Sequence, residues 1–288
     1  MLPTVARAPT SAAWTCPTCA KSRRQRFCPQ CGEERLRPND LSVRYLIGKL
    51  LENTSSIDGK LVRSWRALLT KPGQLTAAHI KGERRRYLAP LALFFIANAI
   101  FVGVQSLTGA NVLSSPLSSH LHAQDWASFA RDVVGDRLAH RNLTLEAYSP
   151  VFDRSALFNA KALIILMALA FAPLPAILFR KTHLPTGAHV VFALHLYAFI
   201  LVLLSVSVLL AQVDVLFGGG GIESSIVDKV LSIFNLLACG TYVFLAIAPV
   251  YSASGWRRAA AALFLTLMLA LLFVGYRFAI FLITFYTT

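Results

Sequence analysis

The sequence predicts an all-α polytopic membrane protein, in which a five-helix transmembrane bundle follows a small N-terminal four-cysteine zinc ribbon and interfacial amphipathic helices. Three observations support this prediction. Hydrophobic residues make up 56% of the 288 residues and charged residues only 15%, which is too apolar for a soluble or a disordered chain. Five apolar stretches have the length of a helix that crosses a bilayer. Four of the five cysteines form two closely spaced C-x-x-C pairs.

The formal net charge is +14, and most of it lies before the first apolar stretch. Residues 1–87 hold 17 Lys and Arg against 6 Asp and Glu. A basic excess at one end of an apolar chain is typical of a water-facing segment beside anionic lipid. We therefore predict a ribbon with a flexible N-terminus over residues 1–38, basic juxtamembrane helices over 39–87 and a membrane domain over 88–288.

The cysteines predict a structural zinc site. Cys16 and Cys19 form the first pair, and Cys28 and Cys31 form the second, followed by Gly32. Two residues between thiolates let both sulfurs of a pair face one metal, and four cysteines leave no open coordination position. A redox pair and a rubredoxin-like iron site are the alternatives. No apolar run typical of a signal peptide precedes the pairs, so we expect reduced thiols in the cytoplasm.

Basic side chains gather at two places beside the predicted membrane surface. One group lies between the two cysteine pairs and the other precedes the first apolar stretch. We interpret both as contacts to membrane lipids, with a cytosolic protein partner as the alternative and nucleic acid as the least favoured one. The sequence does not define an oligomeric state. The residues concerned are Arg23, Arg24, Arg26, Arg84, Arg85 and Arg86.

Two amphipathic helices are predicted between the ribbon and the membrane. Asn39-Asp40 could cap a helix that begins at Leu41, and a second helix covers residues 59–69. Pro72-Gly73 ends the second helix. Gly82 ends a short helix over residues 74–81, and Pro90 falls in the first turn of the first span. Basic residues alternate with apolar ones, which indicates helices that lie in the membrane interface or pack against the inner end of the bundle. Both arrangements stay open.

A resemblance to a known family covers the ribbon and residues 41–102. It rests on the run Ile57 to Lys60, on Pro72-Gly73, Gly82 and Pro90, and on further positions listed below. The chain resembles an uncharacterised bacterial membrane family, domain of unknown function 3667, whose members also begin with a double-knuckle zinc ribbon. The resemblance implies an inner-membrane protein and supplies no substrate or catalytic residue. The further positions are Trp65, Leu68, Leu69, Lys71, Arg84, Arg86 and Tyr87.

The five predicted spans cover residues 88–107, 162–179, 190–213, 230–251 and 259–286. Basic residues flank them at three places that share one side if the count is five: residues 81–86, 180–181 and 257–258. Positively charged loops stay in the cytoplasm, so the N-terminus is predicted inside and the C-terminus outside the bacterial inner membrane. Residues 108–161 form a long outer loop with one short amphipathic helix around Trp126. His120, His122 and Asp125 are interpreted as exposed loop residues rather than metal ligands.

Polar residues inside predicted spans are candidate functional residues. Asn98 and His195 could form hydrogen bonds between helices. Arg277 lies inside the fifth span, where a charge is usually paired, and Asp214 and Asp228 are its candidate partners. Snorkelling of Arg277 to the outer interface is the alternative.

The sequence carries no recognised catalytic motif, so we favour a non-enzymatic membrane protein. Its ribbon and basic helices would dock a cytosolic protein or anionic lipid. A transporter or channel with Arg277 in a polar path is the alternative. A lipid-modifying enzyme that uses Glu83 or His79 is a weaker one.

Overall fold

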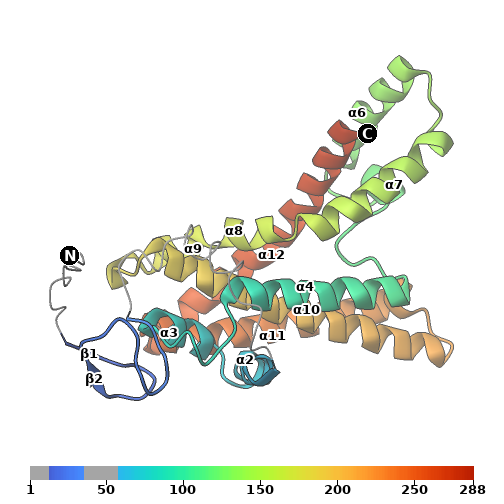
Figure 1. Ribbon diagram of the computed structural model, residues 1–288. Coiled ribbons are helices and arrows are strands. Elements are labelled where there is room, and N and C mark those ends of the chain that lie inside the picture. Colours follow the sequence, from blue (N-terminus) through green and yellow to red (C-terminus); the bar gives the residue numbers. More distant parts are fainter. Residues whose placement is uncertain (1–12, 36–57) are drawn as a thin grey trace, which may run out of the picture.

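The computed structural model describes residues 13–35 and 58–288 (Figure 1). The predicted helix that begins at Leu41 lies outside the described residues. Near the N-terminus, β1 (Trp14–Thr15) pairs with β2 (Ser22–Arg23) in a short antiparallel sheet. The rest of the described chain is dominated by helices, in agreement with the predicted all-α fold.

Four helices in the described part are long and apolar enough to cross a membrane. They are α4 (Pro90–Thr108), α10 (Thr186–Leu216), α11 (Ser225–Tyr251) and α12 (Gly255–Thr287). A fifth crossing exists only if α7 (Leu145–Ala162) counts together with α8 (Ile165–Phe171) and α9 (Pro173–Leu178), which follow after a bend of 54°. The chain is therefore a multi-pass membrane protein.

The second predicted span, residues 162–179, is not a continuous helix. The chain bends between α7 and α8, and α9 begins at Pro173, whose missing N–H favours a helix start. Contacts to α12 hold α7 in its own direction. The Tyr276 hydroxyl donates to the Ala160 carbonyl at 2.7 Å, and the Asn159 amide donates to the Thr284 hydroxyl at 3.0 Å. Helices α8 and α9 lie within the predicted span, and the long-range bonds help to set the direction of α7, which hydrophobicity alone does not predict.

The predicted long loop, residues 108–161, is largely helical. It contains α5 (Leu117–His122), α6 (Ala127–Arg141), which matches the expected amphipathic helix, and α7. These three helices and the last turns of α12 form an arm that projects from the bundle (Figure 1). Arg141 donates to the Thr288 carbonyl at 2.6 Å, and the hydroxyls of Tyr148 and Thr288 lie 2.8 Å apart. A cation at the end of α12 also complements its dipole.

The expected exposure of His120 is wrong. Its side chain is buried in the arm, where the Trp126 indole N–H donates to Nδ1 at 3.2 Å and the Phe281 ring lies 4.9 Å away. Burial, and then the charge of Arg277, lower the pKa of His120 to about 4. His120 is therefore a neutral packing residue.

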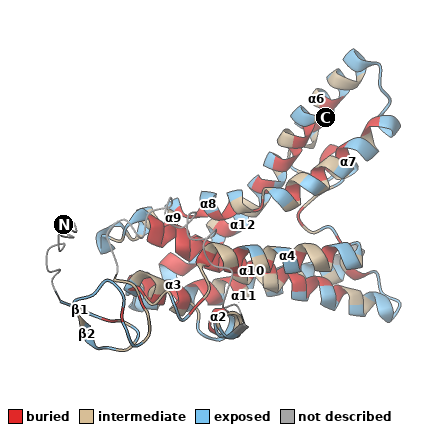
Figure 2. Cartoon of the chain, viewed as in Figure 1, coloured by how far each residue is buried: buried red, intermediate tan, exposed pale blue. Residues whose placement is uncertain are grey.

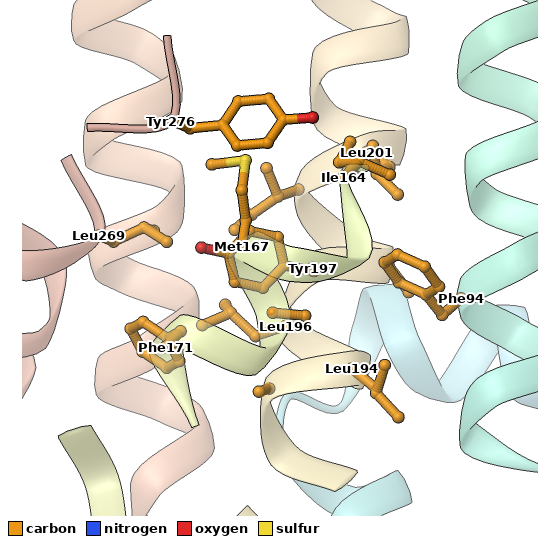
Figure 3. Close-up of a cluster of buried hydrophobic side chains, with 14 of the residues drawn as sticks. Phe94, Ile164, Met167, Phe171, Leu194, Leu196, Tyr197, Leu201, Leu269 and Tyr276 are labelled. Carbon is orange, nitrogen blue, oxygen red and sulfur yellow. The ribbon is translucent and has the colours of Figure 1, made fainter. Parts of the chain in front are cut away.

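Helix α10 forms the centre of the bundle, and α4 packs along it. Its first three turns are buried on all sides, whereas α4, α11 and α12 each keep an exposed face (Figure 2). Figure 3 shows Met167 and Phe171 of α8, Tyr197 of α10 and Leu269 of α12 pointing toward one another. The meeting point of these helices is thus filled by apolar and aromatic side chains.

The outer faces of the helices are apolar as well. On α11, the exposed side chains of Ile226, Val230, Ile233 and Leu237 follow helical spacing. An apolar stripe of this length would be unusual on a protein surrounded by water, and it is what a lipid-facing helix requires.

Helices α2 (Asp58–Thr70) and α3 (Gln74–Lys81) lie at the end of the bundle where α4 and α10 begin and α11 ends. Helix α2 packs against the bundle through Ala67 and Leu68, while Val62 and Leu69 stay exposed on its other face. Helix α3 ends at Gly82, as predicted, with a left-handed backbone that caps its last carbonyls. Pro90 occupies the first turn of α4, also as predicted.

Gly73 joins α2 and α3 and touches α11. Its φ is +80°, and a Cβ at this position would lie 2.4 Å from the Ala246 carbonyl oxygen and 2.8 Å from Pro249. Only glycine therefore combines this backbone conformation with this close approach.

We predict that Gly73→Ala destabilises the protein by about 2–4 kcal/mol, because backbone strain adds to overpacking. Gly109→Ala is the matched control. Gly109 has a φ of +72°, but no other described residue lies within 4 Å of its Cβ position. Thermal unfolding in detergent measures both. Equal losses for the two variants would contradict a role for contact with α11.

Candidate metal centre

The ribbon is built from two knuckles with the same backbone pattern. In the first, the Cys16 N–H donates to the Lys21 carbonyl at 3.0 Å and the Ala20 N–H to the Cys16 carbonyl at 2.8 Å. In the second, the Cys28 N–H donates to the Glu33 carbonyl and the Gly32 N–H to the Cys28 carbonyl, at 2.8 and 2.6 Å. Ala20 and Gly32 both have positive φ. Each knuckle thus turns the chain so that its two cysteines face the other pair.

All four sulfurs lie within 4.8 Å of one another, which brings the predicted ligands Cys16, Cys19, Cys28 and Cys31 together. The Cys16 and Cys31 sulfurs are 3.4 Å apart, and those of Cys19 and Cys28 are 3.5 Å apart. A tetrahedron with metal–sulfur bonds of about 2.3 Å has sulfur–sulfur separations of about 3.8 Å. The donor set and its size therefore fit one tetrahedral metal ion.

The two thiols of the second knuckle differ in acidity. Hydrogen bonds from the backbone N–H groups of Cys31 and Gln30 lower the pKa of Cys28 to about 5, although burial opposes this shift. Arg23 contributes in the same direction. Burial raises the pKa of Cys31 to about 12. A divalent metal ion would hold all four cysteines as thiolates.

Glu33, which directly follows the second knuckle, connects the ribbon to the membrane domain. Its side chain is only 1% exposed. The carboxylate accepts the Thr18 hydroxyl at 2.9 Å and the backbone N–H groups of Arg84 and Arg85, each at 3.2 Å. A buried carboxylate is stable only when such donors surround it. We call these three hydrogen bonds the Glu33 bridge and residues 82–89 the entry turn.

The Arg85 side chain strengthens the same contact. Its guanidinium donates to the Cys31 carbonyl at 3.2 Å and lies directly over Gly32. A Cβ on Gly32 would overlap this guanidinium. Gly32 therefore serves both the turn of the second knuckle and the contact with the entry turn.

The entry turn is also fixed to α2. The Arg63 guanidinium donates to the Arg86 carbonyl at 3.3 Å, and the Leu88 N–H donates to the Ser64 hydroxyl at 2.9 Å. Ser64 is buried. The ribbon, the entry turn and α2 thus form one connected unit at this end of the bundle.

Comparison with protein families assigns part of this unit. Residues 58–102 match the model of a family described as protein of unknown function (DUF3667). We call this matched segment, residues 58–102, the DUF3667 domain. Comparisons with curated proteins and with solved structures found no match. The DUF3667 domain comprises α2, α3, the entry turn and most of α4, so the Glu33 bridge joins the cysteine centre to this domain.

Several of the basic residues expected to contact lipid or a partner are held by the protein itself. Arg23 lies beside Cys28, and Arg26 forms an ion pair of 2.9 Å with Glu34. Arg85 binds the ribbon. The exposed Arg86 stacks over Tyr87 and keeps its charge at the surface.

The predicted intramembrane polar residues have different surroundings. His195 of α10 is buried beside Thr76 of α3, with its Nδ1 2.9 Å from the hydroxyl. Asn98 is on α4, and its side-chain oxygen is buried. Arg277 donates to the Val112 carbonyl at 3.2 Å, near the arm.

The candidate partner Asp214 has a different contact from the one expected. Its carboxylate accepts the Gly221 N–H at 2.9 Å in the α10–α11 turn. The structure thus does not bring Arg277 and Asp214 together as a pair.

Sequence reasoning identified the cysteines and Gly32 but missed Glu33 and Thr18. One signal was present. Glu33 and Glu34 are the first acidic residues in the chain and lie within a strongly basic segment. An acidic residue in that setting, directly after a metal-binding knuckle, indicates an internal contact.

We predict that Glu33→Gln speeds zinc release from the full-length protein to a chelator tenfold or more. The glutamine amide has one oxygen that can still accept one of the Arg84 and Arg85 N–H groups, but its NH₂ faces the other, and loss of a charged acceptor costs about 1.5–3 kcal/mol. The control is Glu34→Gln, which alters the adjacent carboxylate of the Arg26 pair and is expected to change release little. Equal rates for all three proteins would contradict the structural importance of the Glu33 bridge.

Proposed function

We propose that this protein is a non-enzymatic, multi-pass protein of the bacterial inner membrane that presents a metal-held docking platform for anionic lipid on its cytoplasmic side. The platform consists of the ribbon, α2 and the entry turn. The observation that carries the proposal is the Glu33 bridge, because it fixes the metal centre to the basic turn that begins the first span. A cytosolic protein is the second partner that such a platform fits.

The exposed face of α2 supports lipid as the partner. Val62 and Leu69, seven residues apart, are 67% and 47% exposed, and Arg66 is exposed on the same helix. Apolar and basic side chains together are typical of a helix at a lipid interface. The exposed Arg86 adds charge beside it.

The distribution of charge supports a cytoplasmic position for the platform. The basic residues at 81–86, 180–181 and 257–258 flank helix ends that meet at the end of the bundle where α3 lies. Basic loops are retained in the cytoplasm. The N-terminus would then be inside and the last residues of α12 outside.

Zinc is the metal that we propose for the cysteine centre. Four thiolates in a tetrahedron are typical of structural Zn²⁺, and a ribbon of this size has too few apolar residues to fold without a metal. A centre with all positions filled by cysteine has no place for a substrate, which supports a structural role.

The geometry gives less support to the alternatives. A transporter that uses Arg277 would need a polar path, whereas Arg277 bonds a backbone carbonyl and the meeting point of α8, α10 and α12 is apolar (Figure 3). A lipid-modifying enzyme would need an accessible acid or base. His79 is largely buried, and burial followed by the charge of Arg84 lowers its pKa to about 3.

We predict that the reconstituted protein prefers spin-labelled phosphatidylglycerol over spin-labelled phosphatidylcholine, measured as the motionally restricted fraction by electron paramagnetic resonance. Arg66→Gln/Arg86→Gln should reduce the preference several-fold, because each basic residue near an anionic surface contributes about 1 kcal/mol. Arg154→Gln/Lys229→Gln, which removes two exposed charges elsewhere, is the matched control. A preference that is the same in both double variants would exclude the platform as its source.

A further inference from the structure

We propose that Arg277 binds the phosphate of a phospholipid in the leaflet opposite the ribbon, at the level where α12 leaves the hydrocarbon core of the membrane. This inference goes beyond the proposed function, because it assigns a lipid contact at the other end of the molecule. It also places the arm outside the membrane.

One face of α12 shows where lipid contact ends. Leu267, Val274 and Phe281 follow one another at seven-residue intervals, so they lie on the same face of the helix. Leu267 and Val274 are 53% and 48% exposed, which is typical of a lipid-facing surface. Phe281 is fully buried in the arm, where the rings of His120 and Phe152 lie 4.9 and 5.9 Å away. This face therefore changes from lipid contact to protein contact between Val274 and Phe281.

Two helix lengths place Arg277 at this boundary. At a rise of about 1.5 Å per residue, Arg277 lies about 28 Å along α12 from Arg258, close to the hydrocarbon thickness of about 30 Å. Helix α4 has 19 residues and is therefore also about 28 Å long. Arg277 donates at 3.2 Å to the carbonyl of Val112, which lies in the segment that follows the end of α4. Both lengths thus reach the level at which a charged side chain meets headgroups rather than acyl chains.

The Arg277 guanidinium has donors for a ligand. Its side chain is exposed, and the hydrogen bond to Val112 uses one of the five N–H donors that a guanidinium carries. Within residues 13–35 and 58–288, no carboxylate forms an ion pair with it. A guanidinium binds a phosphate through two parallel hydrogen bonds, and every phospholipid carries a phosphate. The charge of Arg277 thus matches the ligand that the leaflet supplies.

The apolar surface before Arg277 favours a lipid over free phosphate as the source of that ligand. Leu271 and Val274 lie within two turns before Arg277 and are 61% and 48% exposed. They offer a surface to the acyl chains of the same lipid whose phosphate binds the guanidinium. In the arm, the Trp126 ring packs 5.2 Å from Phe278, and tryptophan is typical of the headgroup level. A free phosphate would use the guanidinium alone.

The level of Arg277 places α6 in water. Arg131, Asp132 and Asp136 are exposed on this helix. Exposed charges at this density are too costly in the hydrocarbon core. The last turns of α12 therefore extend past the headgroups together with α6, as the projecting arm in Figure 1 requires.

The test is native mass spectrometry of the delipidated full-length protein, titrated with phosphatidylglycerol, with diacylglycerol of the same chains or with inorganic phosphate. We expect one phosphatidylglycerol whose apparent Kd rises at least fivefold in Arg277→Gln and changes less than about twofold in Arg277→Lys, which keeps the charge. The matched control is Arg131→Gln. Arg131 is also exposed and donates to one backbone carbonyl, that of Leu121 at 2.7 Å, but it lies on α6. This control should bind the lipid normally.

Three results would overturn the proposal. Equal affinity for phosphatidylglycerol in the wild type, Arg277→Gln and Arg131→Gln would exclude the contact. An equal loss of diacylglycerol binding in Arg277→Gln would assign the effect to the acyl chains rather than the phosphate. A loss of inorganic phosphate binding without a change for phosphatidylglycerol would overturn the lipid as its source. An unchanged melting temperature of Arg277→Gln supports a specific loss of binding.

A second measurement tests the level of Arg277 without a substitution. In nanodiscs, a nitroxide on the lipid headgroup should broaden the Trp126 indole N–H resonance more than a nitroxide near the end of the acyl chain. The reverse order would place the arm inside the membrane and overturn the proposal.

The contact at Arg277 and the platform fail separately. Arg66→Gln/Arg86→Gln should leave the lipid at Arg277 bound, and Arg277→Gln should leave most of the spin-label preference of the platform intact. Loss of the lipid at Arg277 in Arg66→Gln/Arg86→Gln would assign it to the platform instead.

Discussion

The hydrogen bonds of the buried Glu33 carboxylate are the interaction on which the ribbon end of this protein depends. A charge that is 1% exposed must be compensated by donors, and three of them point at it. Two of these donors are backbone N–H groups of the entry turn. The conformation of the turn must therefore point both N–H groups at the Glu33 carboxylate. A single side chain thereby sets the position of the metal centre relative to the first span.

The entry turn and α3 connect this contact to α10 and α11 of the membrane domain. The entry turn follows α3, whose last carbonyls are capped at Gly82. Helix α3 meets α10 through the Thr76–His195 contact and α11 through Gly73. The DUF3667 domain thus acts as the connector between a metal centre that would fold only with its ion and helices that a bilayer would hold.

Features encoded by neighbouring residues could be predicted from the sequence. The cysteine spacing predicted the cluster, Pro72-Gly73 and Gly82 predicted the ends of α2 and α3, and Pro90 predicted the start of α4. The bend between α7 and α8 could not be predicted from neighbouring residues, because long-range hydrogen bonds between α7 and α12, made by Asn159 and Tyr276, help to set it. The role of Glu33 was hidden for the same reason, since its partners lie 51 and 52 residues away.

The most direct test of this account is hydrogen exchange of the Arg84 and Arg85 amides in the protein reconstituted into nanodiscs, before and after a chelator removes the metal. The account predicts that both amides are protected in the metal-loaded protein and exchange at least tenfold faster once the metal is removed, while α10 amides keep their protection. Protection of Arg84 and Arg85 that does not depend on the metal would contradict it.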